Sequence, residues 1–229
     1  MSFNKISIIM PVLNEAKNLR NILSQLCLSD NEELIVVDGG STDETLSIAG
    51  EFTKKVFQAK SGRASVMNFG AQKAEGDILL FLHADCILPD NAFLLIKEVL
   101  GDKNVAAGVF DLVISDPRLR FRIIEFGVNL RAHLTSLMYG DQGMFLRKDI
   151  FNSIMGFADI PLMEDIEISL RLKKMGKIVF IKSPIKASPR RWLREGVLYT
   201  TFRDWSIAFS YTFPKISPDK LTRYYKDIR

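Results

Sequence analysis

The 229-residue sequence predicts an α/β fold in which a mostly parallel central sheet carries helices on both faces. Short apolar runs of strand length alternate with stretches in which apolar residues recur at helical spacing, an alternation typical of βαβ units. Right-handed crossovers between such strands place helices on both sides of the sheet. With 47% apolar and 25% charged residues, the composition is that of a folded globular protein.

The first half of the chain is predicted to supply the parallel strands. Short apolar segments rich in branched and aromatic side chains are expected to be strands: residues 5–13, 33–38, 55–58 and 77–82. Apolar residues at helical spacing predict helices after residue 14, after residue 41, over 64–74 and after residue 90. Asn14 is expected to cap the first helix, and Ser41 with Glu44 to form a capping box for the second.

The second half is less regular. Strands are expected at 105–114, 143–146 and 177–181, and helices at 164–175 and 192–211. A long amphipathic helix is marked by one apolar stripe, with arginines off the stripe: Leu119, Ile123, Phe126, Leu130, Leu134 and Leu137. No linker interrupts the chain, so we expect a single domain over residues 1–229.

Composition and hydropathy exclude several classes of protein. The two cysteines, Cys27 and Cys86, are too few for a disulfide scaffold or a cysteine-based zinc site. No apolar run approaches the roughly 18–20 residues that span a bilayer. The first apolar run is interrupted by Pro11 and does not resemble a secretory signal. We therefore expect a cytoplasmic protein.

The charge is unevenly placed. The chain has a net charge of +4, but residues 171–229 contain 15 Lys and Arg against 4 Asp and Glu. Such a segment is either a solvated surface or the contact for an anionic partner, such as a phosphate, a lipid headgroup or a nucleic acid. Residues 192–213 also mix aromatic and apolar side chains with arginines, which leaves open core packing, a homodimer interface or an interfacial helix at a membrane surface.

Polar side chains follow three of the predicted strands. Asn14 and Glu15 follow the first strand, Asp38 closes the second, and His83 and Asp85 follow the strand at 77–82. Ligands of such sheets bind beyond the carboxyl ends of the strands. The sequence therefore predicts a binding site at this edge of the sheet.

Each of these motifs also has a purely structural interpretation. The segment from Asp38 to Asp43 opens a helix, whose N-terminal N–H groups favour anions. The Asp38 carboxylate could accept a hydrogen bond from a base or a ribose, or could simply close a tight turn. The segment contains neither the G-x-G-x-x-G fingerprint nor a Walker A loop. Asp85 could hold Mg²⁺ or Mn²⁺, or cap its loop.

Two further motifs lie in the second half. Glu164 and Asp165 open a predicted helix, where the helix dipole favours carboxylates and where one of them could act as a general base. Arg190 and Arg191 precede Trp192. Arginines can clamp a diphosphate and tryptophan can stack on a sugar or base, although a basic surface beside a core tryptophan gives the same pattern.

In their order along the chain, these motifs resemble those of the family 2 glycosyltransferases, which have the GT-A fold. The resemblance covers about residues 5–195 and is carried by five segments: Ile9 to Glu15, Val36 to Asp43, Gly76 to Asp85, Glu164 to Asp165 and Arg190 to Trp192. Residues 139–143, with 162–165 and 190–192, resemble a small soluble subgroup associated with arsenosugar biosynthesis.

The resemblance implies a metal-dependent, hexosyl-type glycosyltransferase that uses Mn²⁺ or Mg²⁺ and a nucleotide-diphospho-sugar donor. It assigns the donor to Pro11, Leu13, Asn14, Glu15, Asp38, Arg63, His83 and Asp85. Within this set, Asp85 would bind the metal that bridges the diphosphate. His83 occupies the first position of the family's D-x-D motif, and this departure affects the ribose contact and the metal preference.

The resemblance also assigns the catalytic side. Asp165 would be the base, with Glu164 near the acceptor. Gln142 and Gly143 would line the acceptor side, and Arg191 with Trp192 would lie beside the diphosphate and acceptor. Residues 1–115 would then bind the nucleotide sugar, 116–195 would carry the acceptor and catalytic groups, and 196–229 would form a basic, aromatic helical extension.

The implied reaction inverts the configuration of a sugar that moves to a hydroxyl or phosphate of a small-molecule or lipid-linked acceptor, and it involves no nucleic acid. Two other enzyme classes fit less well. A sugar-1-phosphate nucleotidylyltransferase has a Gly-rich, basic loop after its first strand, whereas residues 11–15 are neither Gly-rich nor basic. A haloacid-dehalogenase-type phosphatase has an aspartate at the place of Gly40. A membrane-surface binding module without catalysis remains the alternative outside the enzymes.

Overall fold

The structure, a computed structural model, describes residues 3, 5–60, 62–213 and 216–224. Its strands are β1 (Ile6–Val12), β2 (Glu32–Asp38), β3 (Val56–Gln58), β4 (Ile78–Phe81), β5 (Cys86–Ile87), β6 (Val105–Ile114), β7 (Met144–Arg147) and β8 (Lys177–Ala187). Its α-helices are α1 (Ala16–Leu23), α2 (Thr45–Phe52), α3 (Arg63–Lys73), α4 (Ala92–Leu100), α5 (Leu119–Thr135), α6 (Lys148–Ser153), α7 (Glu164–Leu172), α8 (Arg190–Glu195), α9 (Val197–Thr212) and α10 (Pro218–Leu221). Short 3₁₀ turns, η1 and η2, lie at Gly140–Gln142 and Thr222–Tyr224.

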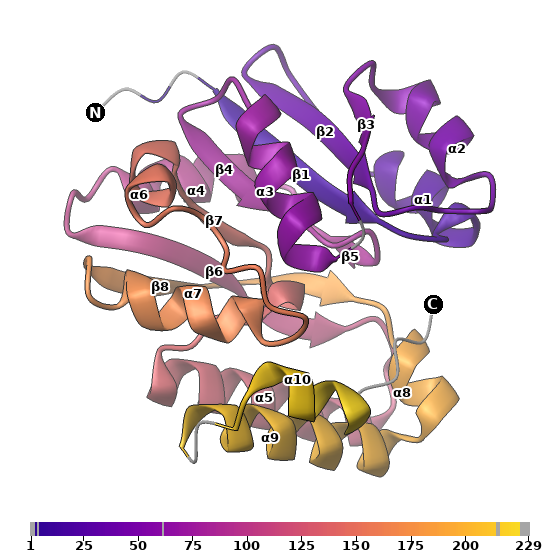
Figure 1. Ribbon diagram of the computed structural model, residues 1–229, viewed down its shortest axis with the longest axis vertical. Helices are drawn as coiled ribbons and strands as arrows, with labels where there is room; N and C mark the ends of the chain where they lie inside the picture. Colours follow the sequence, from indigo (N-terminus) through magenta and orange to yellow (C-terminus); the bar gives the residue numbers. More distant parts are fainter. Residues whose placement is uncertain (1–2, 4, 61, 214–215, 225–229) are drawn as a thin grey trace.

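The strands form one eight-stranded sheet in the order β3-β2-β1-β4-β7-β6-β8-β5. The pairs β2–β3, β1–β2, β1–β4 and β6–β8 are parallel, and the other three pairs are antiparallel. The predicted α/β fold with a mostly parallel sheet is confirmed. Because β1, β2 and β4 run in the same direction, their carboxyl ends meet at one edge of the sheet (Figure 1).

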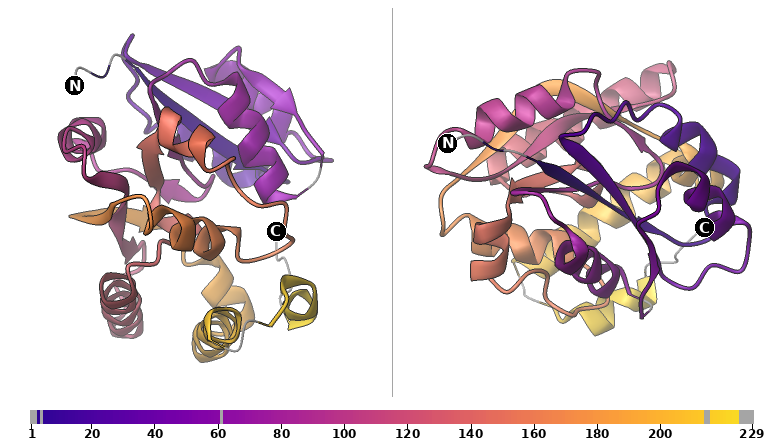
Figure 2. Two further views of the ribbon diagram at one scale, coloured as in Figure 1. Left: turned by 60° about the vertical axis from the view of Figure 1, so that its left-hand side comes forward. Right: turned by 90° about the horizontal axis from the view of Figure 1, so that it is seen from above.

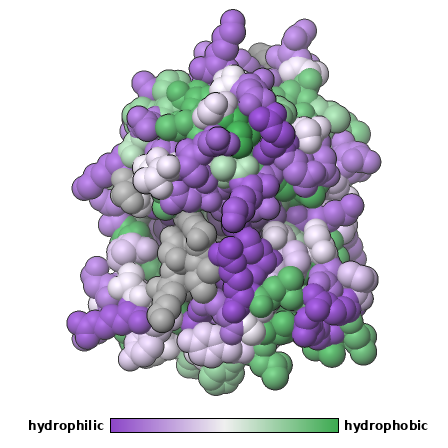
Figure 3. Space-filling view, turned by 90° about the vertical axis from the view of Figure 1, so that its right-hand side faces the viewer, coloured by the Kyte–Doolittle hydropathy of each residue, from purple (hydrophilic) through white to green (hydrophobic). Residues whose placement is uncertain are grey.

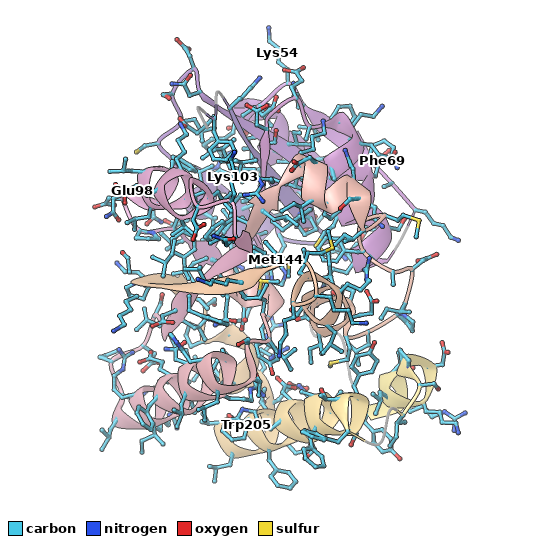
Figure 4. The ribbon with its side chains drawn as sticks, turned by 90° about the vertical axis from the view of Figure 1, so that its left-hand side faces the viewer. Lys54, Phe69, Glu98, Lys103, Met144 and Trp205 are labelled. Carbon is cyan, nitrogen blue, oxygen red and sulfur yellow. The ribbon has the colours of Figure 1, made fainter. Side chains whose placement is uncertain are left out.

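Helices cover both faces of the sheet, as predicted (Figure 2). Alternate residues of β1 face opposite sides: Ile8 and Met10 pack in a core with α1, α4 and α5, whereas Ile9 packs with α3, α6 and α7. Glu98 on α4 and Phe69 on α3, labelled in Figure 4, mark these two sides. This period-2 alternation is what a strand buried on both faces requires.

Four local predictions are wrong. The helix expected over 192–211 is two helices, α8 and α9, because Gly196 between them has φ 97°, which breaks the helical path. The N-cap of α1 is Glu15, since Asn14 adopts a left-handed conformation. The capping box is absent, because the Ser41 hydroxyl donates to Asp38 and α2 begins only at Thr45. Strand β8 also continues to Ala187, beyond the predicted residue 181.

Of the apolar stripe predicted from residue 119, the part from Leu119 to Leu134 lies on α5 but faces away from the core, whereas Leu137 lies beyond the helix and is buried. Leu119, Phe126 and Leu134 are 74%, 70% and 76% exposed. The buried face of α5 is instead formed by Phe121, Ile124, Glu125, Val128 and Ala132. The helix therefore has apolar side chains on two faces, one against the sheet and one outward.

Strands β3, β2, β1 and β4 come from residues 1–115, but in the rest of the sheet β7 and β8, from residues 116–195, alternate with β6 and β5. The division into donor and acceptor parts stays a prediction. In the predicted extension over 196–229, residues 214–215 and 225–229 lie outside the described residues. Within the described part of the chain, each helix is too short or too polar to cross a bilayer. The cytoplasmic location stays a prediction.

Candidate active site

One cavity of about 480 Å³ opens at the carboxyl ends of β1, β2 and β4. Helices α3, α5, α7, α8 and α9 and the segment Tyr139 to Asp141 supply much of the rest of its wall. Most of the residues predicted for the site line this cavity: Pro11, Leu13, Glu15, Arg63, His83, Asp85, Glu164, Asp165, Arg191 and Trp192. The fold thus brings together motifs that are more than 150 residues apart in the sequence.

Asn14 and Asp38 are not part of the cavity wall. Both carboxylate oxygens of Asp38 accept hydrogen bonds in its own turn, from the backbone N–H groups of Gly40 at 3.0 Å and Ser41 at 2.9 Å and from the Ser41 hydroxyl. The Asn14 side-chain oxygen accepts from the Thr42 backbone N–H at 2.9 Å. These bonds join the loops after β1 and β2, so both residues hold the shape of this edge of the sheet. Their direct contact with a nucleoside stays a prediction.

Gln142 and Gly143 lie behind the wall. Gln142 is fully buried, and its Oε1 accepts from the Tyr139 backbone N–H at 3.0 Å. Gly143 has φ 63°, and a Cβ there would lie 3.1 Å from Ile185. The cavity is reached instead by the three residues before them, Tyr139, Gly140 and Asp141. The acceptor role predicted for Gln142 and Gly143 stays a prediction.

Arg190, the first residue of α8, contacts the loops after β1 and β4. Its guanidinium donates to both carboxylate oxygens of Glu15, at 2.9 and 2.7 Å, and lies 4.0 Å from the Asp85 carboxylate. This bidentate contact is the strong geometry for an arginine and a carboxylate. Burial, and secondly the charge of Glu15, raise the pKa of Asp85.

Asp85 and Asp141 are the cavity carboxylates that fit a divalent cation. Burial raises the pKa of Asp141, as does the nearby charge of Asp85. A cation between them would offset this repulsion. One or two carboxylates, completed by phosphates and water, are the usual protein share of a Mg²⁺ shell. Within the described residues, no group of three or more His, Cys, Asp or Glu gathers as a complete site.

Asp165 occupies the first turn of α7. One oxygen of its carboxylate accepts from the Gly140 backbone N–H at 2.9 Å, and the other accepts from the Ile166 N–H at 2.8 Å. Burial, and secondly the charge of Glu164, raise the pKa of Asp165 to about 7. The adjacent Glu164 is buried and accepts from Arg63 at 3.2 Å. A carboxylate with a pKa near neutrality is suited to accept and release a proton.

Gly140 sets how closely the two sides of the cavity approach. A Cβ at this position would lie 2.7 Å from the His83 ring and 3.7 Å from the Asp165 carboxylate. Only glycine fits at the first of these distances without displacing the imidazole. The segment Tyr139 to Asp141 therefore brings the loop after β4 and the start of α7 together.

Side chains of α9 contact Arg191 and Trp192 and fix their positions. Arg191 pairs with Asp204, and its guanidinium lies 5.6 Å from the centre of the Trp192 ring. The Trp192 indole N–H donates to the Thr201 hydroxyl at 3.3 Å. The basic aromatic extension thus supplies part of the cavity wall, which the sequence motifs did not predict.

Arg131 is the cavity residue most clearly missed from the sequence. Its guanidinium carbon lies 4.0 Å from the centre of the Tyr139 ring and 5.2 Å from that of Trp205. Its Nε and Nη1 atoms are buried without a hydrogen-bond partner among the described residues. The only sequence signal was that Arg131 is charged and lies off the apolar stripe, which does not distinguish a cavity residue from a surface residue.

Comparison with known proteins identifies the class to which this fold and site belong. The family model for glycosyl transferase family 2 matches residues 7–158, more than half of the chain. The chain therefore belongs to glycosyl transferase family 2, and the resemblance seen in its motifs is confirmed. This membership favours glycosyl transfer over the nucleotidylyltransferase, phosphatase and binding-module alternatives.

The chain is similar to a PGL/p-HBAD biosynthesis glycosyltransferase of Mycobacterium tuberculosis, with 32% identity over 160 residues, which are 65% of this chain and 61% of that relative. Its fold is similar to that of the mannosyltransferase PcManGT from Pyrobaculum calidifontis in complex with GDP-Man and Mn²⁺ (TM-score 0.66, 20% identity, 90% of this chain and 61% of that chain). It is also similar to S. aureus TarS 1-349 in complex with UDP-GlcNAc (TM-score 0.64, 19% identity, 80% and 58%).

These similarities support the GT-A fold. The chain spans less than two thirds of the length of each of these proteins. None of the three names the arsenosugar subgroup, so that finer resemblance stays a prediction.

Proposed function

We propose that this protein is an inverting glycosyltransferase that moves a sugar from a nucleotide-diphosphate donor to a hydroxyl or phosphate of a small-molecule or lipid-linked acceptor. The observation that carries the proposal is the convergence of Asp85, after β4, and Asp165, at the start of α7, on one cavity. The first fits a divalent cation and the second has a pKa of about 7. The two groups supply different parts of one displacement reaction.

In this proposal the loops after β1 and β4 bind the donor, with Glu15 held in place by Arg190. Asp85 would hold Mn²⁺ or Mg²⁺, which when bound would supply charge stabilisation for the leaving diphosphate. Asp165 accepts the proton of the acceptor hydroxyl as that oxygen attacks the anomeric carbon. Because the attack comes from the side opposite the leaving group, the product has inverted configuration, and no covalent sugar–enzyme intermediate forms.

A panel of nucleotide sugars tests the proposal. We expect UDP or GDP with Mn²⁺ or Mg²⁺ to raise the melting temperature, because a ligand that binds only the folded state stabilises it. Slow hydrolysis of one donor sugar, measured as released nucleoside diphosphate, identifies the nucleotide and the sugar. If no nucleoside diphosphate shifts the melting temperature with either metal, the proposal is wrong.

Arg131 is expected to bind an anionic group of the donor or the acceptor. Losing a hydrogen bond to a charged group costs about 1.5–3 kcal/mol, which is roughly 10- to 150-fold in affinity. We therefore expect Arg131→Met, which keeps an apolar stem beside Tyr139, to raise the KM for one substrate by at least about tenfold. Arg20→Met, which changes an exposed arginine outside the cavity wall, is the control. Unchanged KM values for both substrates would contradict this role.

A further inference from the structure

The outward faces of α5 and α9 carry two apolar stripes with the same spacing. Their residues recur at i, i+4, i+7, i+11 and i+15, which is one face of a helix. We call these residues together the apolar platform: Leu119, Ile123, Phe126, Leu130 and Leu134 from α5, and Leu198, Phe202, Trp205, Phe209 and Phe213 from α9 and its C-cap. Every one is exposed, from 40% at Trp205 to 86% at Leu198.

The two stripes lie side by side. A Cβ at Gly127 on α5 would lie 3.1 Å from the Trp205 ring, so the helices touch at this point. Trp205 is labelled on α9 in Figure 4, and Figure 2 shows both helices at one end of the molecule. In the space-filling view of Figure 3, hydrophobic side chains gather along the corresponding lower edge. Isolated exposed apolar residues need no explanation, but a contiguous patch of this kind marks an interaction surface.

The charges around the platform are of one sign. Glu125 and Asp204 are the only carboxylates in the sequences of α5 and α9, and both point inward. Glu125 accepts from the Ile114 N–H at 2.5 Å, and Asp204 pairs with Arg191 and Arg203. The exposed charged side chains near the N-terminal ends of the two helices are arginines: Arg118, Arg120 and Arg122 beside α5, and Arg194 on α8 just before α9. Arg118 pairs with Asp116 and Arg122 with Glu125, so Arg120 and Arg194 carry the net positive charge of this margin. An apolar surface with a cationic margin is complementary to anionic lipid.

We propose that the apolar platform docks onto an anionic lipid bilayer as a peripheral contact. Its aromatic and aliphatic side chains enter the headgroup region, and the arginines contact lipid phosphates. The inner faces of the same helices line the cavity through Val128 and Arg131 on α5 and Thr201 and Ala208 on α9. Docking therefore places the cavity beside the membrane surface. Resting on the proposed function, this position assigns a lipid-linked acceptor.

A second copy of the chain is a less complementary occupant. In a two-fold pairing through the platform, α5 and α9 of the second copy would offer no outward carboxylate to pair with the arginines. Like charges brought together oppose association. The charge pattern therefore favours an anionic surface over self-association.

Liposome flotation of the full chain tests the proposal. We expect flotation with vesicles that contain phosphatidylglycerol at low salt, and at least about tenfold less with pure phosphatidylcholine or at 1 M salt, because salt screens the arginine contacts. The double variant Phe126→Ser/Phe202→Ser should lower the bound fraction at least about tenfold, since each aromatic anchor is lost. Leu94→Ser/Met175→Ser, which changes exposed apolar residues outside the platform, is the matched control and should float like the parent.

Circular dichroism and donor hydrolysis in solution separate docking from folding and from the proposed function. Both should be unchanged in Phe126→Ser/Phe202→Ser, because neither side chain lines the cavity. A folded parent that does not float on anionic vesicles would overturn the proposal. So would flotation that the double variant keeps, or a dimer of the parent that the double variant abolishes while neither protein floats. Absence of donor hydrolysis by the parent would instead contradict the glycosyltransferase proposal and would not affect the interpretation of the flotation result.

Discussion

Replacing Asp165 with Asn is expected to lower the rate of sugar transfer by about 10²- to 10⁴-fold, the usual cost of losing a positioned base. The amide has nearly the shape of the carboxylate but cannot accept the acceptor's proton. Its oxygen can still accept from the Gly140 backbone N–H, although its NH₂ group cannot accept from the Ile166 N–H, so the contact between α7 and the segment Tyr139 to Asp141 should be retained. We therefore expect donor binding, measured by calorimetric titration of the nucleoside diphosphate with Mn²⁺, to be nearly unchanged.

Glu167→Gln is the control, because Glu167 lies on the same helix, pairs with Arg171 and is not part of the cavity wall. Transfer should fall only in Asp165→Asn. If the Asn variant keeps transfer within a few-fold of the parent, another group is the base, and the adjacent Glu164 becomes the next residue to replace.

The pH dependence gives the same residue a second signature. With a pKa of about 7 for Asp165, the base form becomes dominant as the pH rises through neutrality, so the rate of transfer should rise and then level off. The free energy of unfolding changes with pH in the opposite direction to the rate. The ordinary pKa of an aspartate is 3.8. Between pH 3.8 and about pH 7, Asp165 keeps a proton in the folded state that it has lost in the unfolded chain, so the free energy of unfolding falls as the pH rises. At pH 8, Asp165→Asn should melt at least as high as the parent.

Replacing Asp85 with Ala is expected to abolish metal-dependent donor binding. The side chain is partly exposed on the loop after β4, so its loss leaves no large void in the core. Calorimetric titration of UDP or GDP should show an increase in affinity with Mn²⁺ in the parent and none in the variant. The affinity measured without metal should be similar in the two proteins.

Asp141→Ala distinguishes between the two cavity carboxylates. If Asp85→Ala keeps the Mn²⁺-dependent gain in affinity and Asp141→Ala loses it, the metal role belongs to Asp141. Asp149→Ala, which removes an exposed carboxylate outside the cavity, is the control and should bind like the parent. Both results are read from binding, so they do not depend on knowing the acceptor.

The sequence by itself determined the class of fold and the place of the site. Continuous apolar runs located β1, β2, β4 and β6, because a strand that is buried on both faces must be apolar over most of its length. Parallel strands bring their carboxyl ends to one edge, so the amino-acid sequence alone was enough to place Glu15, His83 and Asp85 together. The order of the motifs along the chain also indicated the family, because it resembles the order in the family 2 glycosyltransferases.

Only the tertiary structure decided which faces and which groups are used. Periodicity shows that the apolar residues of the stripe on α5 share one side of the helix, but it does not show whether that side faces the core or the solvent. The partner elements decide this, and here the sheet packs against the other face, through Phe121 and Val128. Likewise, a carboxylate in a sequence has no fixed pKa. Burial and the charge of Glu164 raise the pKa of Asp165, because the energy of a charge depends on the atoms that surround it.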